Sequence, residues 1–202
     1  MSSAQNSRGS VAAFGFRVKS GWASAILLNG PLKAPVVLSR WNVLMSDPKI
    51  PETKQPYHAS TGVLEERSTI ISKRVRIIRN ATRASVRALL RESRNAGLKI
   101  RIAGLVVGST IEPQSIGNPH IRAHAFEGQL FRTVLSEALK THGIPVSVFV
   151  ERDVFARASN ILRKPETRLR QALLEMGRLH KPWSANEKLA ALAAWVALTR
   201  TR

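Results

Sequence analysis

The sequence contains no cysteine among its 202 residues. This absence excludes a disulfide framework, thiolate zinc sites, iron–sulfur clusters and cysteine nucleophiles. Long apolar runs are also missing, and without about 18 consecutive apolar residues we expect no membrane span. The first forty residues lack the charged region and apolar region of a secretory signal. Together these absences predict a soluble protein of the cytoplasm.

Acidic residues are scarce, and aspartate is nearly absent. The chain has 13 Asp and Glu against 32 Lys and Arg, which gives a formal net charge of +19. The only aspartates are Asp47 and Asp153, and no acid of either kind precedes Asp47. Such a charge concentrates polyanions, and phosphate neutralisation supplies much of the affinity of proteins for nucleic acid. The composition therefore predicts a nucleic-acid partner, either DNA or RNA, rather than a membrane.

The first part of the chain has the pattern of a β-meander. Residues 1–10 are polar and predict a flexible N-terminus, and residues 11–202 predict a single domain. Turn signals at Ser20-Gly21 and Asn29-Gly30-Pro31 separate three apolar or alternating runs. We expect antiparallel strands over residues 13–19, 22–28 and 35–44. A proline-rich loop over residues 46–62 is expected to follow.

Helices and buried strands alternate through the rest of the chain. Apolar residues recur at helical spacing from 64 to 95, and the continuous apolar runs 99–108 and 144–151 are typical of fully buried strands. Further helices are expected over residues 121–141, 153–163, 166–180 and 185–199. The order β-β-β-α-β-α-β-α predicts an α/β fold with one mixed five-stranded sheet. We expect the second strand to be antiparallel to its neighbours, helices on both faces and extra helices at the C-terminus.

This order of elements resembles the ribonuclease H-like superfamily. The second half resembles its RuvC and YqgF resolvase-like branch in the segments GLVVGSTIEP, HAFEGQLFRTVLSEALKTHGIPVSVFVERD and NEKLAALAAW. The likeness covers residues 100–198 in sequence pattern and the whole domain in topology. It implies a nucleic-acid-binding fold whose site lies at the carboxyl ends of the strands.

The resemblance also implies a metal-dependent phosphodiesterase. Nucleases of this superfamily use clustered carboxylates to hold two Mg²⁺ or Mn²⁺ ions about 3.5–4 Å apart. The acids at matching places are Glu112, Glu151 and Glu187 as catalytic residues and metal ligands, with Asp153 as a further ligand. The family places its principal aspartate in the first strand, where this chain has Arg17 and Lys19. The missing acid predicts a weak or lost nuclease activity.

The same acids have structural interpretations. Glu151 and Asp153 precede an expected helix, and acids at this end complement the helix dipole. Glu187 follows Ser184 by three residues, which is the spacing of a capping box. The sequence alone leaves both the metal-binding and the structural interpretation open.

One expected helix carries a row of arginines. Its members are spaced three or four residues apart: Arg76, Arg79, Arg83, Arg87, Arg91 and Arg94. At a rise of about 1.5 Å per residue, the row extends roughly 27 Å along one face of the helix, opposite the apolar residues. Arginine is suited to bidentate phosphate contact. The row predicts a surface that binds the nucleic-acid backbone, with a merely solvated helix face as the alternative.

Two other features carry less information. Lys19-Ser20-Gly21 is expected at a hairpin tip within reach of a phosphate, although no P-loop motif is present. His120 and His124 are four residues apart, but none of the five histidines falls into a zinc spacing with a carboxylate partner. We therefore expect these histidines to be surface residues rather than metal ligands.

Three function classes remain from the sequence. The first is a nucleic-acid-binding ribonuclease H-like protein with weak or degenerate metal-dependent nuclease activity. The second is a non-catalytic binding or assembly protein that docks RNA, DNA or a larger particle on its basic surface. The third, an actin-like phosphotransferase remnant, is disfavoured because such enzymes need two domains of this kind. The missing first-strand acid favours the second class over the first.

Overall fold

A computed structural model describes residues 10–59 and 63–201. The N-terminal segment predicted to be flexible lies outside the described residues, except for Ser10, which begins the first strand instead. That strand reaches back to Ser10 because its parallel partner reaches equally far, with Ser10 paired to Leu98.

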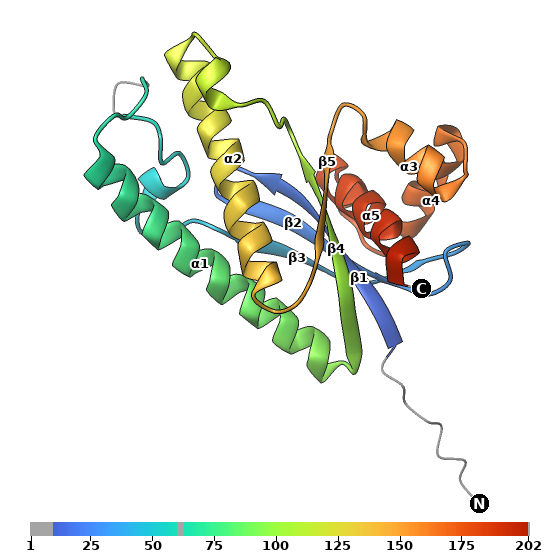
Figure 1. Cartoon of the computed structure of the whole chain (residues 1–202). Coiled ribbons are helices and arrows are strands. Elements are labelled where there is room, and N and C mark those ends of the chain that lie inside the picture. The colour runs from blue at the N-terminus through green and yellow to red at the C-terminus, as the bar shows by residue number, and fades with distance from the viewer. Residues whose placement is uncertain (1–9, 60–62, 202) are drawn as a thin grey trace, which may run out of the picture.

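The five strands form one mixed sheet, as predicted. Their spatial order is β3-β2-β1-β4-β5. β2 is antiparallel to β1 and β3, whereas β1, β4 and β5 run parallel. The carboxyl ends of β1, β4 and β5 therefore lie at the same edge (Figure 1). The strands span Ser10–Lys19 (β1), Trp22–Asn29 (β2), Val36–Leu44 (β3), Leu98–Val107 (β4) and Val146–Val150 (β5).

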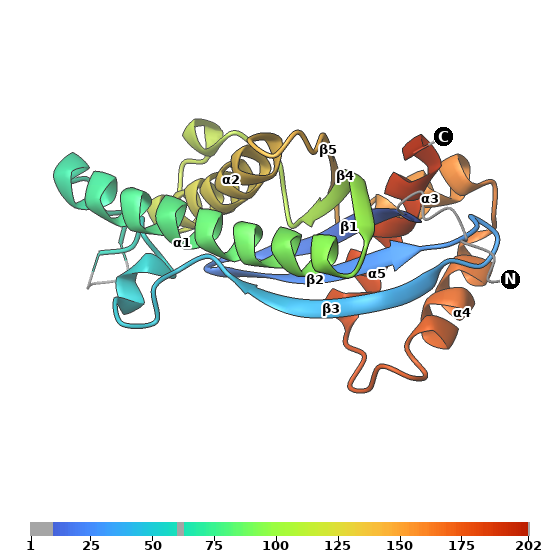
Figure 2. The same cartoon turned by 90° about the horizontal axis from the view of Figure 1, so that it is seen from below.

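Helices cover both faces of the sheet, which confirms the layered arrangement expected from the sequence. Alternation along β1 divides the core in two: Phe14 and Phe16 face the layer of α1 and α2, and Ala13 faces the layer of α3, α4 and α5. Figure 2 shows the two layers from below. The helices span Ser68–Asn95 (α1), Pro119–Lys140 (α2), Val154–Leu162 (α3), Glu166–Met176 (α4) and Ala185–Leu198 (α5).

The final helix lies unusually close to the sheet. A Cβ atom at Gly15 of β1 would lie 1.9 Å from the carbonyl oxygen of Ala190, and one at Gly104 of β4 would lie 2.5 Å from that of Ala193. Glycine in the two central strands and alanine on α5 thus let the backbones meet. Every residue of α5 from Leu189 to Leu198 is buried as a result.

Helix α1 is shorter than its apolar pattern predicted. The pattern indicated a start at Leu64, whereas the helix starts at Ser68. Leu64 instead forms a β-bridge with His58. Ile78, Val86 and Leu89 of α1 are buried against the sheet, as the helical spacing predicted.

None of the helices within residues 10–59 and 63–201 has an apolar stretch sufficient to span a bilayer.

Candidate functional site

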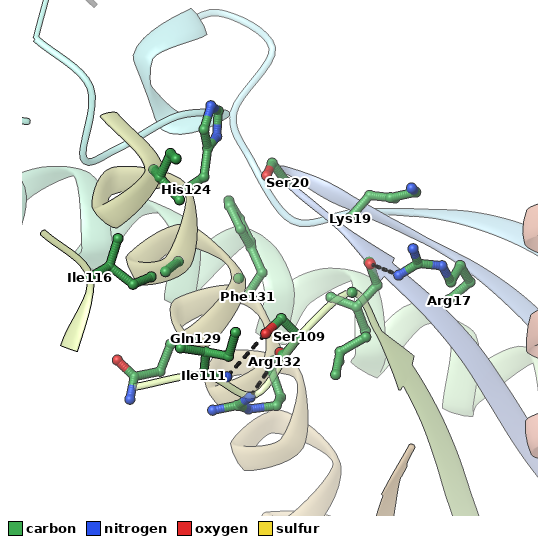
Figure 3. Close-up of a pocket in the computed structure, with 16 residues that line it drawn as sticks. Arg17, Lys19, Ser20, Ser109, Ile111, Ile116, His124, Gln129, Phe131 and Arg132 are labelled. Carbon is green, nitrogen blue, oxygen red and sulfur yellow. Dashed lines mark hydrogen bonds between the residues drawn. The ribbon is translucent and has the colours of Figure 1, made fainter. Parts of the chain in front are cut away.

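A pocket of about 380 Å³ opens where β1 and β4 end. We call it the edge pocket. Its walls come from the end of β1 with the turn to β2, from the segment after β4, and from α2. Figure 3 shows these three walls and the side chains that line them. Since the carboxyl ends of parallel strands are where α/β folds gather their ligands, this pocket is the first candidate for a functional site.

The edge pocket is positively charged. Arg17, Lys19 and Arg132 line it, and no acidic residue does among the described part of the chain. Lys19 is exposed, and neither Lys19 nor Arg132 forms an ion pair with a described acid. Ser20, Ser109 and other polar groups stand beside them. A concave site with cations and hydroxyls and without carboxylates is suited to a phosphate group.

Arg17 lies in β1, near where the resemblance expects an aspartate. Its guanidinium is 3% exposed and donates hydrogen bonds to the carbonyl oxygens of Val18 (2.8 Å) and Val106 (3.4 Å) and to the carboxylate of Glu151. Burial lowers the pKa of Arg17, and the charge of Glu151 opposes that shift. Glu151, which directly follows β5, is thus paired with a cation of the protein itself.

The other predicted ligands have structural partners or stand apart. Glu187 forms a capping box with Ser184 and also accepts a hydrogen bond of 3.0 Å from Arg40, so the capping interpretation is confirmed. Asp153 is the residue that precedes α3. Glu112 is exposed five residues after β4 ends, and it is not among the residues that line the edge pocket.

These four acids do not form a cluster. Among residues 10–59 and 63–201, no group of three with Glu112, Glu151, Asp153 or Glu187 has ligand atoms within 4.8 Å of one another. Mg²⁺ and Mn²⁺ need several oxygen ligands around one ion, and a two-metal site needs them around two. The residues present therefore do not fit the metal pair that the resemblance implies. One of the four acids, Glu151, is already engaged, because Arg17 forms an ion pair with it.

The arginine row on α1 is present but is not uniform. Five of its six members are exposed: Arg76, Arg83, Arg87, Arg91 and Arg94. Arg79 departs from the row, since it turns toward α2 and forms an ion pair with Glu137. Glu92, the one acid on α1, accepts a hydrogen bond of 2.8 Å from the Trp41 indole. The exposed members form a second cationic surface, which we call the α1 arginine row.

The structure brings three histidines together. His58, His120 and His124 meet at the N-terminal part of α2, where His120 and His124 are exposed, as expected, and His58 is partly buried. One ring nitrogen from each lies within 4.8 Å of the others. The spacing of His120 and His124 was a signal in the sequence, but His58 comes from a segment far away along the chain. His124 also lines the edge pocket.

Sequence reasoning also missed part of the edge pocket. The turn at Lys19 and Ser20 was noted only as a weak phosphate signal, and Arg132 was not singled out. Arg132 lies in the middle of α2 and faces the end of β4, where its Nη1 is 3.4 Å from the carbonyl oxygen of Ser109. Only the packing of α2 beside β4 brings it to the pocket.

Comparison with known proteins identifies the fold. No protein-family model matches the sequence, and no curated protein matches it by sequence. T. thermophilus RuvC in complex with a Holliday junction substrate matches with a TM-score of 0.54 and 12% identity, over 92% of this chain and 91% of that chain. Another structure of Thermus thermophilus RuvC matches with a TM-score of 0.55 and 11% identity, over 92% of each chain. The chain therefore has the ribonuclease H-like fold in the form found in RuvC.

Proposed function

We propose that this protein binds nucleic acid at the carboxyl edge of its sheet and does not hydrolyse it by the two-metal route. The observation that carries the proposal is the edge pocket, a cationic pocket at the carboxyl ends of β1 and β4. Lys19 and Arg132 supply that charge, whereas the guanidinium of Arg17 is paired with Glu151. The net charge of +19 supports a polyanionic partner.

The α1 arginine row supports the same proposal from a separate surface. Its five exposed arginines lie on one helix with Glu92 as the only acid, and Glu92 is engaged by Trp41. Backbone contacts of this kind give affinity without base specificity. We therefore propose a protein that holds a nucleic acid by its phosphates and reads its shape rather than its sequence. We also propose that the protein acts in the cytoplasm, an expectation that comes from the composition of the sequence.

The matched RuvC is described with a Holliday junction, so branched DNA is the first ligand to try. Binding to a four-way DNA junction, a linear duplex and an RNA hairpin can be compared by fluorescence anisotropy. We expect the double variant Lys19→Gln/Arg132→Gln to bind its preferred ligand about tenfold more weakly or worse. The plot of log K against log salt should flatten by about two units, because two phosphate contacts are lost.

The matched control removes the same charge from the opposite layer. Lys33→Gln/Arg168→Gln changes two exposed cations that lie away from the edge pocket. This variant should bind like the wild type after a small uniform loss. Equal losses in both double variants would contradict the proposal, since the pocket would then contribute only net charge.

Catalysis is tested on the same substrates with Mg²⁺ or Mn²⁺. We expect weak cleavage or none, and we expect Glu112→Gln and Glu187→Gln to leave binding unchanged. Robust cleavage that either substitution abolishes would overturn the non-catalytic part of the proposal. It would restore the metal-dependent nuclease, the alternative that the resemblance implies.

A further inference from the structure

Three histidine rings converge beside the edge pocket. Nε2 of His120 lies 3.3 Å from Nε2 of His124. The ring of His58 lies over both, with centroid distances of 5.2 Å to His120 and 4.5 Å to His124. Among residues 10–59 and 63–201, this is the one group of three histidine, aspartate or glutamate side chains with ligand atoms all within 4.8 Å.

The chain holds two of these rings on a well-capped helix. The side chain of Asn118 accepts a hydrogen bond from the amide of Ile121, and Pro119 starts the first turn of α2. Because His120 and His124 are four residues apart in α2, they lie one turn apart on the same face of the helix.

The third ring is fixed by the segment that precedes α1. The carbonyl oxygens of Pro56 and His58 both accept hydrogen bonds from Arg74 of α1. Next to His58, Tyr57 stacks on Phe126 of α2, with centroids 5.0 Å apart. These contacts hold the backbone of His58 and its neighbours against α1 and α2. The fold thus brings His58 to the two exposed histidines of α2.

A buried carboxylate lies behind the rings. Glu127 is fully buried, with Oε1 2.7 Å from Nδ1 of His58 and Oε2 3.4 Å from Nδ1 of His124. Burial raises the pKa of Glu127, and the nearby histidines act against that shift. Oε2 of Glu127 and Nε2 of His58 are buried without a hydrogen-bond partner in the described structure. Two orphaned polar atoms in one cluster are costly unless something else satisfies them.

We propose that His58, His120 and His124 bind one Zn²⁺ ion, with Glu127 orienting His58 and His124. Metal-binding histidines characteristically offer their second ring nitrogen to a carboxylate. Nδ1 of His58 is hydrogen-bonded to Glu127, and Nδ1 of His124 lies 3.4 Å from the other oxygen of the same carboxylate. Imidazole nitrogens bind Zn²⁺ and other late first-row transition-metal ions in preference to Mg²⁺ or Ca²⁺, which prefer oxygen ligands.

The spacing of the rings agrees with this metal. Tetrahedral zinc with Zn–N bonds of about 2.0–2.1 Å separates its ligand nitrogens by roughly 3.3–3.4 Å. The separation of the His120 and His124 Nε2 atoms, 3.3 Å, matches that figure. Three protein ligands leave the fourth position to water or to a bound group. Because His124 also lines the edge pocket, the metal would adjoin the proposed phosphate site.

The test uses the full chain without an affinity tag, stripped of metal by a chelator and titrated with Zn²⁺. We expect one equivalent to bind with saturation. Cobalt in place of zinc should give the visible absorption bands of a tetrahedral site. His124→Ala should lower the zinc affinity by about 100-fold or more, and Glu127→Gln by about 10–100-fold. Zinc should also raise the thermal midpoint of the wild type, because it binds the folded state.

Two variants separate this site from simpler explanations. His142→Ala changes an exposed histidine outside the cluster and should leave zinc affinity unchanged. His58→Ala distinguishes the three-histidine site from a weak surface pair on α2, since a pair would keep its affinity. If His58→Ala is poorly folded, His58→Gln, which keeps a polar side chain of similar size, provides the same comparison against His142→Ala. The proposal is overturned if the wild type shows no saturable binding, or if the folded His58 variant binds zinc like the wild type.

Discussion

Arg17 of β1 donates a hydrogen bond to Glu151, the residue that follows β5, across the carboxyl ends of the central strands. The guanidinium is 3% exposed and the carboxylate 46% exposed, so the two partners are unequally solvated. The pair occupies Glu151, which the resemblance implied as a metal ligand, with a protein cation.

A double-mutant cycle measures this pair. Glu151→Ala leaves a buried guanidinium with fewer partners and should cost about 1–3 kcal/mol of unfolding free energy. Arg17→Met removes the buried charge itself, so adding Glu151→Ala to it should cost much less. Urea denaturation of the four proteins should give a coupling energy of about 1 kcal/mol or more. Additive losses would mean that Arg17 is held mainly by the carbonyl oxygens of Val18 and Val106.

The α1 arginine row is tested by salt titration. Arg83→Gln/Arg87→Gln/Arg91→Gln removes three exposed charges and should flatten the plot of log K against log salt by about two to three units. Fold stability should change little, because these side chains face solvent. The control Lys33→Gln/Arg168→Gln/Arg178→Gln removes equal charge from exposed positions elsewhere. Parallel lines for wild type and the α1 variant would show that the row is only a solvated face.

Arg79 should behave unlike its neighbours in the row. It forms an ion pair with Glu137 of α2, and both side chains are partly exposed. Arg79→Gln should therefore lower stability by about 1 kcal/mol or less and should change nucleic-acid affinity less than Arg83→Gln. Thermal denaturation and anisotropy on the two single variants make this comparison. A larger loss of affinity from Arg79→Gln would place it in the contact surface after all.

The close approach of α5 to the sheet predicts a stability difference between glycines. Gly15→Ala and Gly104→Ala should each destabilise by about 1–3 kcal/mol or more, since the new methyl meets α5 backbone that cannot move aside. Gly128 lies within α2, and a Cβ there meets nothing within 4 Å. Gly128→Ala should instead stabilise by about 0.5–1 kcal/mol. Urea denaturation midpoints of the three variants measure these differences in stability. Equal effects at Gly15, Gly104 and Gly128 would contradict the close approach of α5 to the sheet.

Glu65 makes stability depend on acid pH. Hydrogen bonds from the side chain and backbone of Arg67 lower the pKa of Glu65 to about 2. In the unfolded chain a glutamate titrates at about 4.3. The folded pKa is the lower one, so Glu65 stabilises above about pH 4.3, and this contribution is lost as pH falls toward 2. The stability gap between wild type and Glu65→Gln should therefore shrink from pH 5 to pH 2.5. The exposed Glu52→Gln serves as control and should show a much smaller gap throughout.

The sequence by itself determined the order of the helices and strands and the positive sign of the net charge. Turn residues such as Gly21 and Gly30 lie at positive φ where the hairpins were predicted, and alternation along β1 divided the core between two helical layers. Such features follow from local backbone preference and from periodicity, which act over a few residues. The net charge is a property of composition and needs no structure.

Only the tertiary structure decided what stands at the edge of the sheet. The resemblance implied that Glu112, Glu151 and Glu187 bind metal. In the structure Glu151 pairs with Arg17, and Glu187 contacts Ser184 and Arg40. His58 meets His124 only because the segment before α1 folds against α2. Contacts between residues distant in the chain depend on packing geometry, and one-dimensional spacing does not contain it. For that reason the scaffold was predictable from the sequence, whereas the edge pocket and the histidine cluster were not.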